Sequence, residues 1–245
     1  MQTALMFLFV VATIFSAVNL SADDRRSEWT VVLIGGLDSD PTPRQIDETA
    51  PRAEGNSGLY QLRGDLVQDG FATEYFNWNG TRAGKMRTMP APGSQEIVDA
   101  IRQQREKSPE KRWAIVGNSW GGHTAWEVCD RLAKSEPAIP IELAVFLDAS
   151  SAGRSNTLRP TALPENVRSA AHFFTRNLLG WRDWTGEPRL KSIDLGDPAH
   201  GFLKPAGPKY DSLFDVHAHI AAEWDEAIHK AIRQELETVA KPKLP

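Results

Sequence analysis

Short apolar runs alternate with amphipathic segments along most of the chain. Runs rich in β-branched and aromatic residues predict buried strands, and apolar residues spaced three and four positions apart predict helices. The expected strands cover 29–34, 71–78, 113–116, 141–147, 170–174 and 190–195. The expected helices cover 59–70, 94–107 with Ser94 as cap, 124–134 and 221–236. This alternation predicts an α/β fold, with a mostly parallel central sheet and helices on both faces.

The first 22 residues differ in character from the rest of the chain. An apolar run from Ala4 to Val18 leads to the small residues Ser21 and Ala22, and the first charge is Asp23. The run is typical of a secretory signal peptide and is shorter than the roughly 20 residues that a membrane-spanning helix needs. No Lys or Arg precedes it. We expect cleavage and export to the periplasm or the extracellular space; the alternatives are an uncleaved N-terminal membrane anchor and a misassigned start.

Residues 23–245 have the composition of one globular domain. The chain has 245 residues, of which 41% are hydrophobic and 24% charged, which suffices for one sizeable core but not for two ordinary ones. The formal net charge of −4 and the lack of a polybasic run argue against nucleic acid and anionic membranes as partners. The single cysteine, Cys129, precludes an intramolecular disulfide and is expected to be a buried apolar residue. The expected partner is a small-molecule or lipidic ester.

The segment from Gly117 to Gly121 carries the pattern Gly-x-Ser-x-Gly around Ser119. It lies between an expected strand and an expected helix, which is the setting of a nucleophile elbow, a strained turn that exposes the serine at the carboxyl end of a central strand. The two glycines let the strand and the helix approach each other closely. The amide of Trp120, at the helix N-terminus, is then a candidate oxyanion donor. The alternative is a Gly-rich turn that only connects the two elements.

Two further strand ends carry candidate chemistry. The first strand ends in Gly-Gly, and we expect the next amide, that of Leu37, to be the second oxyanion donor, with the amide of Gly36 as second choice. A simple turn is the alternative there. Asp148 follows the strand over 141–147, at the same sheet edge as Ser119, where it can orient a histidine. The alternative is that Asp148 caps a turn.

The segment from Gly117 to Asp148 resembles the thioesterase-type branch of the α/β-hydrolase superfamily. The resemblance rests on Gly-x-Ser-x-Gly-Gly, on Ala125, Glu127 and Leu132 in the following helix, and on the strand that ends in Leu147-Asp148. In that branch the acid follows the nucleophile by under thirty residues, and Asp148 lies 29 residues after Ser119. The resemblance implies an α/β-hydrolase fold and hydrolysis of an ester or thioester. The polar segment 154–164 does not match the helical lid of many such enzymes, so we expect an open cleft.

The resemblance also implies a histidine between the last strand and the C-terminal helix. Of the six histidines, His219 matches this place best, followed by His217 and then His200. The other three fall within expected helices or a strand, namely His123, His172 and His229. Asp215 with His217 and His219 would give an incomplete ligand set for a metal, so we expect neither a metal nor another cofactor.

The sequence therefore predicts a secreted serine hydrolase of ester or thioester bonds. Ser119 is the expected nucleophile, His219 the general base and Asp148 the acid that orients it, and the reaction passes through an acyl-serine. A non-catalytic α/β-hydrolase-fold protein that binds a ligand in the same cleft is the alternative. Among enzymes, a lipase or carboxylesterase is the alternative to a thioesterase.

Overall fold

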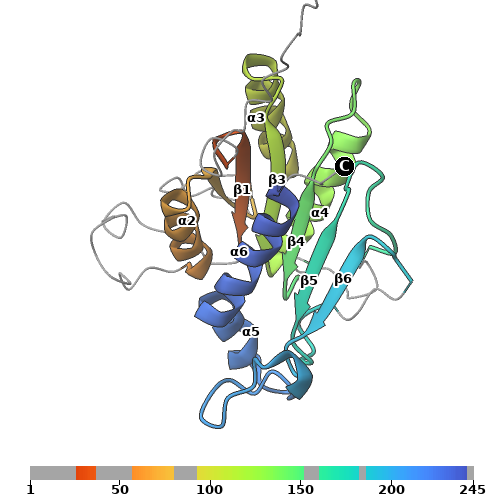
Figure 1. Ribbon diagram of the computed structural model, residues 1–245. Coiled ribbons are helices and arrows are strands. Elements are labelled where there is room, and N and C mark those ends of the chain that lie inside the picture. The colour runs from red at the N-terminus through yellow and green to blue at the C-terminus, as the bar shows by residue number, and fades with distance from the viewer. Residues whose placement is uncertain (1–25, 37–56, 80–92, 152–159, 182–185, 242–245) are drawn as a thin grey trace, which may run out of the picture.

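The computed structural model describes residues 26–36, 57–79, 93–151, 160–181 and 186–241 (Figure 1). The expected signal segment and Leu37 lie outside these ranges. The elements in chain order are β1 (Trp29–Gly35), α2 (Gly58–Gln68), β2 (Ala72–Asn77), α3 (Ser94–Lys107), β3 (Arg112–Asn118), α4 (Trp120–Ala133), β4 (Leu143–Leu147), β5 (Ala170–Phe174), β6 (Leu190–Asp194), the 3₁₀ turn η2 (Pro198–His200), α5 (Val216–Trp224) and α6 (Glu226–Ala240).

The six strands form one parallel sheet in the order β2-β1-β3-β4-β5-β6. The chain adds β2 on one side of β1, then crosses over to add β3 on the other side, and continues outward from there. Parallel sheets of this kind bind ligands in the crevice at the carboxyl ends of the strands where the order reverses, which here is between β1 and β3. The parallel sheet confirms the fold class that the sequence predicts.

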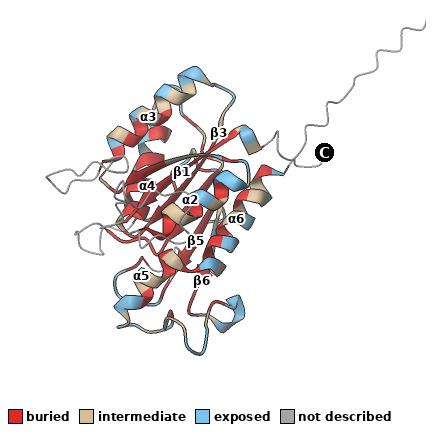
Figure 2. Cartoon of the chain, turned by 90° about the vertical axis from the view of Figure 1, so that its left-hand side faces the viewer, coloured by how far each residue is buried: buried red, intermediate tan, exposed pale blue. Residues whose placement is uncertain are grey.

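Helices cover both faces of this sheet (Figure 2). On one face, α2 and α6 pack against side chains that include Val31 and Leu33 of β1. On the other face, α3 and α4 pack against side chains that include Val32 and Ile34. Successive strand residues point to opposite faces, so a strand covered on both sides is a continuous apolar run. Every residue of β1 is buried, which explains why its sequence is easy to identify as a strand.

The C-terminal segment differs from the single helix expected over 221–236. It forms two helices, α5 and α6, and the chain turns at Asp225 between them. Asp215 caps α5 by accepting a hydrogen bond from the amide of His217, and Asp225 caps α6 by accepting one from the amide of Ala227. Each aspartate satisfies an amide that the first helical turn leaves unpaired. The caps, which hydrophobic spacing does not register, explain the wrong prediction.

Two helix starts also differ from the prediction. The helix α4 begins at Trp120 rather than at residue 124, because Gly121 and Gly122 carry no side chain that a hydrophobic pattern could register. Ser94 is the first residue of α3 rather than its cap; the cap is Gly93, which makes no side-chain capping bond.

Cys129 lies on the inner side of α4, in the core between this helix and the sheet. It is fully buried, as expected, and this burial raises the pKa of its thiol far above the usual range. Among the described helices, none has both the length and the apolar character needed to cross a membrane.

Candidate active site

Ser119 occupies a sharp turn between the end of β3 and the start of α4. Its backbone has φ 51° and ψ −123°, a conformation that costs free energy for any residue other than glycine. Three backbone hydrogen bonds hold it there. Its amide donates to the carbonyl of Leu147 at 3.0 Å, and its carbonyl accepts from the amides of Gly122 and Ser150, each at 2.9 Å. This is the strained strand-to-helix geometry of a nucleophile elbow.

The glycines on both sides of Ser119 are required by close packing. A Cβ atom at Gly121 would overlap the backbone carbonyl of Ile34, and one at Gly117 would overlap the carbonyl of Gly121. The start of α4 therefore packs directly on the backbones of β1 and β3, which agrees with the close approach inferred from the sequence. Any side chain at either position would push the serine turn away from the sheet.

Ser119, His219 and Asp148 form one hydrogen-bonded chain, which we call the Ser-His-Asp chain. Ser119 Oγ lies 2.8 Å from His219 Nε2, and His219 Nδ1 lies 2.6 Å from Asp148 Oδ2. The three residues come from the end of β3, the first turns of α5 and the end of β4. Asp148 is fully buried, whereas the His219 side chain keeps 12% of its surface exposed. A buried acid, a histidine and a serine in this order are the parts of an activated nucleophile.

The carboxylate of Asp148 has partners on every side. Its Oδ1 accepts a hydrogen bond from the amide of Thr175 at 2.9 Å, and its Oδ2 accepts one from the Thr175 hydroxyl at 2.8 Å as well as contacting His219. Gly180 packs against the same carboxylate, because a Cβ atom there would overlap Oδ1. These contacts offset the cost of burying the charge and fix its direction. Thr175 follows β5, at the sheet edge that carries Ser119 and Asp148, but its role could not be read from the sequence.

Among the described residues, no histidine other than His219 is hydrogen-bonded to the Ser119 side chain. His217 is exposed on α5, two residues before His219, and His200 is exposed with its Nδ1 2.8 Å from the carbonyl of Asp194. The remaining three are buried within helices or a strand, namely His123 in α4, His172 in β5 and His229 in α6. The structure thus brings His219, and neither His217 nor His200, to Ser119. His219 lies within α5 rather than in the loop expected before the C-terminal helix. Within the described ranges, no three or more His, Cys, Asp or Glu side chains gather as metal ligands.

Two backbone segments flank Ser119 where an oxyanion would form. Trp120 is the first residue of α4, so its amide belongs to the group that a helix N-terminus leaves unpaired. Gly36 follows β1 and lies against the serine, because a Cβ atom there would come within 2.9 Å of Ser119 Cβ. The structure thus places Gly36 and Trp120 beside the nucleophile, and Leu37 falls outside the described residues.

Glu223 lies one turn after His219 on α5 and links this helix to α2. It is buried, and its Oε1 accepts hydrogen bonds from Ser57 Oγ at 2.9 Å and from the amide of Leu59 at 3.3 Å. Tyr75 Oη donates to Ser57 Oγ at 2.8 Å, so β2 joins the same cluster. Burial raises the pKa of Glu223, with the hydrogen bonds from Ser57 and Leu59 opposing the shift. Sequence reasoning missed this residue, because its partners lie far away along the chain.

The raised pKa of Glu223 predicts a pH-dependent contribution to stability. The folded chain binds this proton more tightly than the unfolded chain, so the free energy of unfolding falls as pH rises from the ordinary glutamate pKa through the folded pKa. Glu223→Gln keeps an acceptor for Ser57 and Leu59 but removes the titration. The free energy of unfolding of the variant, minus that of the wild type, should therefore increase from about pH 4 to about pH 8. Urea unfolding of both proteins at the two pH values measures this; an equal difference at both would contradict it.

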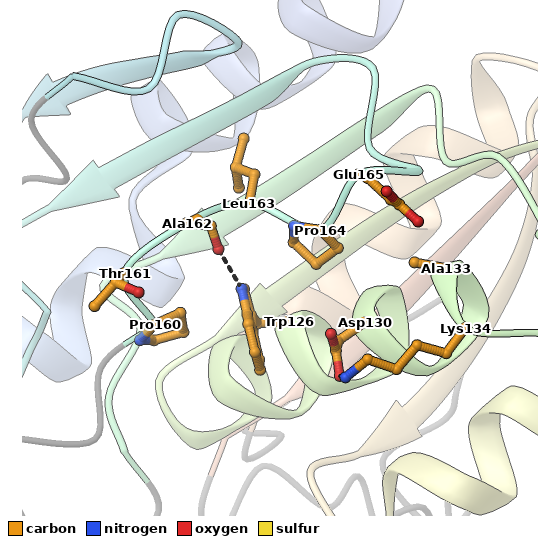
Figure 3. Close-up of a pocket in the computed structure, with 10 residues that line it drawn as sticks. All are labelled: Trp126, Asp130, Ala133, Lys134, Pro160, Thr161, Ala162, Leu163, Pro164 and Glu165. Atoms are coloured by element: carbon orange, nitrogen blue, oxygen red, sulfur yellow. Dashed lines mark hydrogen bonds and ion pairs between the residues drawn. The ribbon is translucent and has the colours of Figure 1, made fainter.

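A pocket of about 540 Å³ lies on the outer side of α4, away from the Ser-His-Asp chain (Figure 3). It is lined by Trp126, Asp130 and Ala133 of the helix, by its C-cap Lys134 and by residues 160–165. Trp126 Nε1 donates to the carbonyl of Ala162 at 3.0 Å, and Asp130 forms an ion pair with the C-cap Lys134. Since the three residues of the Ser-His-Asp chain do not line it, this pocket is not part of the candidate active site.

The chain is similar to several solved structures at low sequence identity. A candidate hydrolase of the α/β superfamily from Xanthomonas campestris pv. campestris is 12% identical, with a TM-score of 0.38, and the match covers 85% of this chain and 99% of that one. A cutinase-like protein from Cryptococcus sp. is 11% identical, with a TM-score of 0.43 and coverages of 88% and 96%. An acetyl xylan esterase is 15% identical, with a TM-score of 0.32 and coverages of 86% and 94%. No protein-family model and no curated protein matches the sequence.

The molecule's own geometry is sufficient to assign the fold. The order in which strands are added to the parallel sheet reverses between β1 and β3, and the strained serine follows β3 at this point. The acid follows the next strand, β4, and the histidine comes after the last strand, β6. The sheet order, the strained elbow and the chain order of Ser119, Asp148 and His219 show that this protein has the α/β-hydrolase fold.

Proposed function

We propose that the protein is a serine hydrolase that cleaves carboxylic esters or thioesters. The observation that carries the proposal is the Ser-His-Asp chain, with 2.8 Å between Ser119 Oγ and His219 Nε2 at a strained elbow. A structural hydrogen-bond network does not require the backbone strain at Ser119, whereas a nucleophile that must project from the sheet does. The apolar run over 4–18 supports the further proposal that the enzyme is exported.

In the proposed reaction, Ser119 Oγ attacks the carbonyl carbon of the substrate while His219 Nε2 removes the hydroxyl proton. Asp148, bonded to Nδ1, holds the imidazole in the correct tautomer and stabilises its charged form. The amides of Trp120 and of Leu37 or Gly36 stabilise the oxyanion, and each donor in such a site contributes roughly 3 kcal/mol. The C–O or C–S bond then breaks, and His219 returns the proton to the leaving alcohol or thiol.

The second half of the reaction regenerates the enzyme. Water attacks the acyl-serine carbonyl as His219 takes its proton, a second oxyanion forms, and the bond to Ser119 Oγ breaks. His219 then gives the proton to Ser119, and a carboxylic acid is released. Neither half requires a metal or an organic cofactor. An ester and a thioester of the same acyl group, compared in one assay, distinguish an esterase from an enzyme of the resembled thioesterase-type branch.

The experiment that tests the proposal is labelling of the folded protein with a fluorophosphonate, followed by mapping of the adduct by mass spectrometry. We expect one adduct, on Ser119. Ser150 offers a matched control, because its Oγ lies 3.3 Å from Ser119 Oγ and both residues are buried. Ser150→Ala should still be labelled. An adduct on Ser150, or no adduct on protein with a cooperative unfolding transition, would overturn the proposal and favour a ligand-binding role without catalysis.

A further inference from the structure

Exposed apolar side chains are concentrated in one region of the described chain. Seven large apolar side chains of the described residues are exposed, and six of them belong to two segments near His219 and Asp148. We call these six the apolar rim: Leu178, Leu179, Leu213, Phe214, Val216 and Ile220. Phe214 is the extreme case, with 79% of its surface exposed. Single exposed apolar residues are ordinary, but a cluster of them marks a binding surface.

The two segments of the rim are joined to each other and to the Ser-His-Asp chain. The amide of Leu178 donates to the carbonyl of Leu213 at 3.2 Å, which holds the segments side by side. Ile220 directly follows His219 on α5. Two residues beyond Leu178, Gly180 packs on the carboxylate of Asp148. Figure 1 shows α5 and the loop before it together at one end of the molecule. The rim therefore adjoins the acid and histidine side of the site.

The exposure of the rim indicates the physical form of what it contacts. A pocket for a single dissolved acyl chain would have buried apolar walls. The rim side chains instead have between 38% and 79% of their surface exposed. Side chains that project in this way can enter an apolar phase, where they lose their contact with water.

The charge near the rim indicates that this phase is neutral. Lys204, Lys209, Asp211 and Asp215 lie in the same loop as Phe214, between η2 and α5, so the acidic and basic groups of this loop are equal in number. The whole chain has a formal net charge of −4. Binding to an anionic membrane surface depends on clustered Lys and Arg, and the rim has no such cluster among its described neighbours in this loop.

We propose that the apolar rim seats the protein on droplets of a neutral, water-insoluble ester of the acylglycerol class. The rim side chains enter the surface layer, and the ester carbonyl reaches Ser119 from that layer. This inference rests on the proposed function and adds the physical form of the substrate to it. It predicts a higher rate on a droplet surface than on the same ester in solution.

The test measures hydrolysis of tributyrin below and above its solubility limit. For the wild type, the rate should rise more steeply with substrate once droplets form. Phe214→Ser and Ile220→Ser should each lower the ratio of the droplet rate to the dissolved-ester rate by about tenfold, since each removes an apolar side chain from the droplet surface. Both positions are exposed, and thermal unfolding checks that each variant is folded.

Val67→Ser is the matched control. Val67 is the exposed apolar residue of the seven that lies outside the rim, and its 50% exposure is close to the 53% of Val216. Val67 lies near the C-terminal end of α2. The contact between α2 and Glu223 of α5 is at the other end of α2, at Leu59. The control should leave the rate ratio unchanged. If it lowers the ratio as much as the rim variants do, the inference is overturned.

A binding measurement separates attachment from turnover. Ser119→Ala protein should float with tributyrin droplets and stay in solution with anionic phospholipid vesicles; the reverse result overturns the inference. If the wild type hydrolyses dissolved tributyrin without a gain on droplets, the inference fails and the proposed function stands. If neither form of the ester is hydrolysed, the proposed function fails, and this inference fails with it.

Discussion

Ser119→Ala is expected to lower kcat/KM for ester hydrolysis by about 10⁶-fold, because no other group can form the acyl intermediate. The substitution removes only Oγ, which bonds His219 and Ser150, and keeps the Cβ atom and the backbone conformation of the elbow. The fold should therefore survive. Initial rates on a dissolved ester measure the loss, and thermal unfolding shows that the variant is folded. Residual activity within tenfold of the wild type would mean that another residue is the nucleophile.

His219→Ala should be about as severe as the serine substitution, because the two residues act as one unit. The double variant Ser119→Ala/His219→Ala should then be no slower than either single variant. His217→Ala is the matched control: His217 lies in the same helix, two residues away, and is exposed. We expect its kcat/KM to remain within about twofold of the wild type, since it lies outside the hydrogen-bonded chain. A large loss in His217→Ala with little effect at position 219 would reverse the assignment of the base.

Residues whose positions depend on local sequence could be predicted. Ser119 and Asp148 each follow a continuous apolar run, and parallel strands bring such positions to one edge of the sheet. The glycines on both sides of Ser119 indicate close packing of the strand and the helix, and this packing involves residues near Ser119 in the sequence. His219 could be ranked above His217 only through the resemblance, and its helix was expected to start after it. The cap at Asp215 moves this start upstream.

Residues whose roles depend on distant contacts could not be predicted. Thr175, which follows β5, contacts Asp148 from 27 residues further along the chain, and Glu223 contacts Ser57 across 166 residues. The sequence around either residue does not indicate which distant residue it contacts. Whether an apolar side chain is exposed depends on the fold. The residues of the apolar rim could therefore not be distinguished from core residues by their hydrophobicity in the sequence. Assignment to the thioesterase-type branch and export of the chain stay predictions.

The burial of Cys129 makes the protein suitable for site-specific labelling. A thiol reacts as its thiolate, so we expect the buried thiol of Cys129, whose pKa is raised by burial, to be unreactive toward alkylating reagents while α4 stays packed on the sheet. No other cysteine occurs in the sequence. A cysteine introduced at an exposed position such as Phe214 would therefore be the one reactive thiol of the folded protein. A maleimide dye attached there needs no cysteine-free background, and its emission would report directly on the polarity of whatever surface the molecule meets.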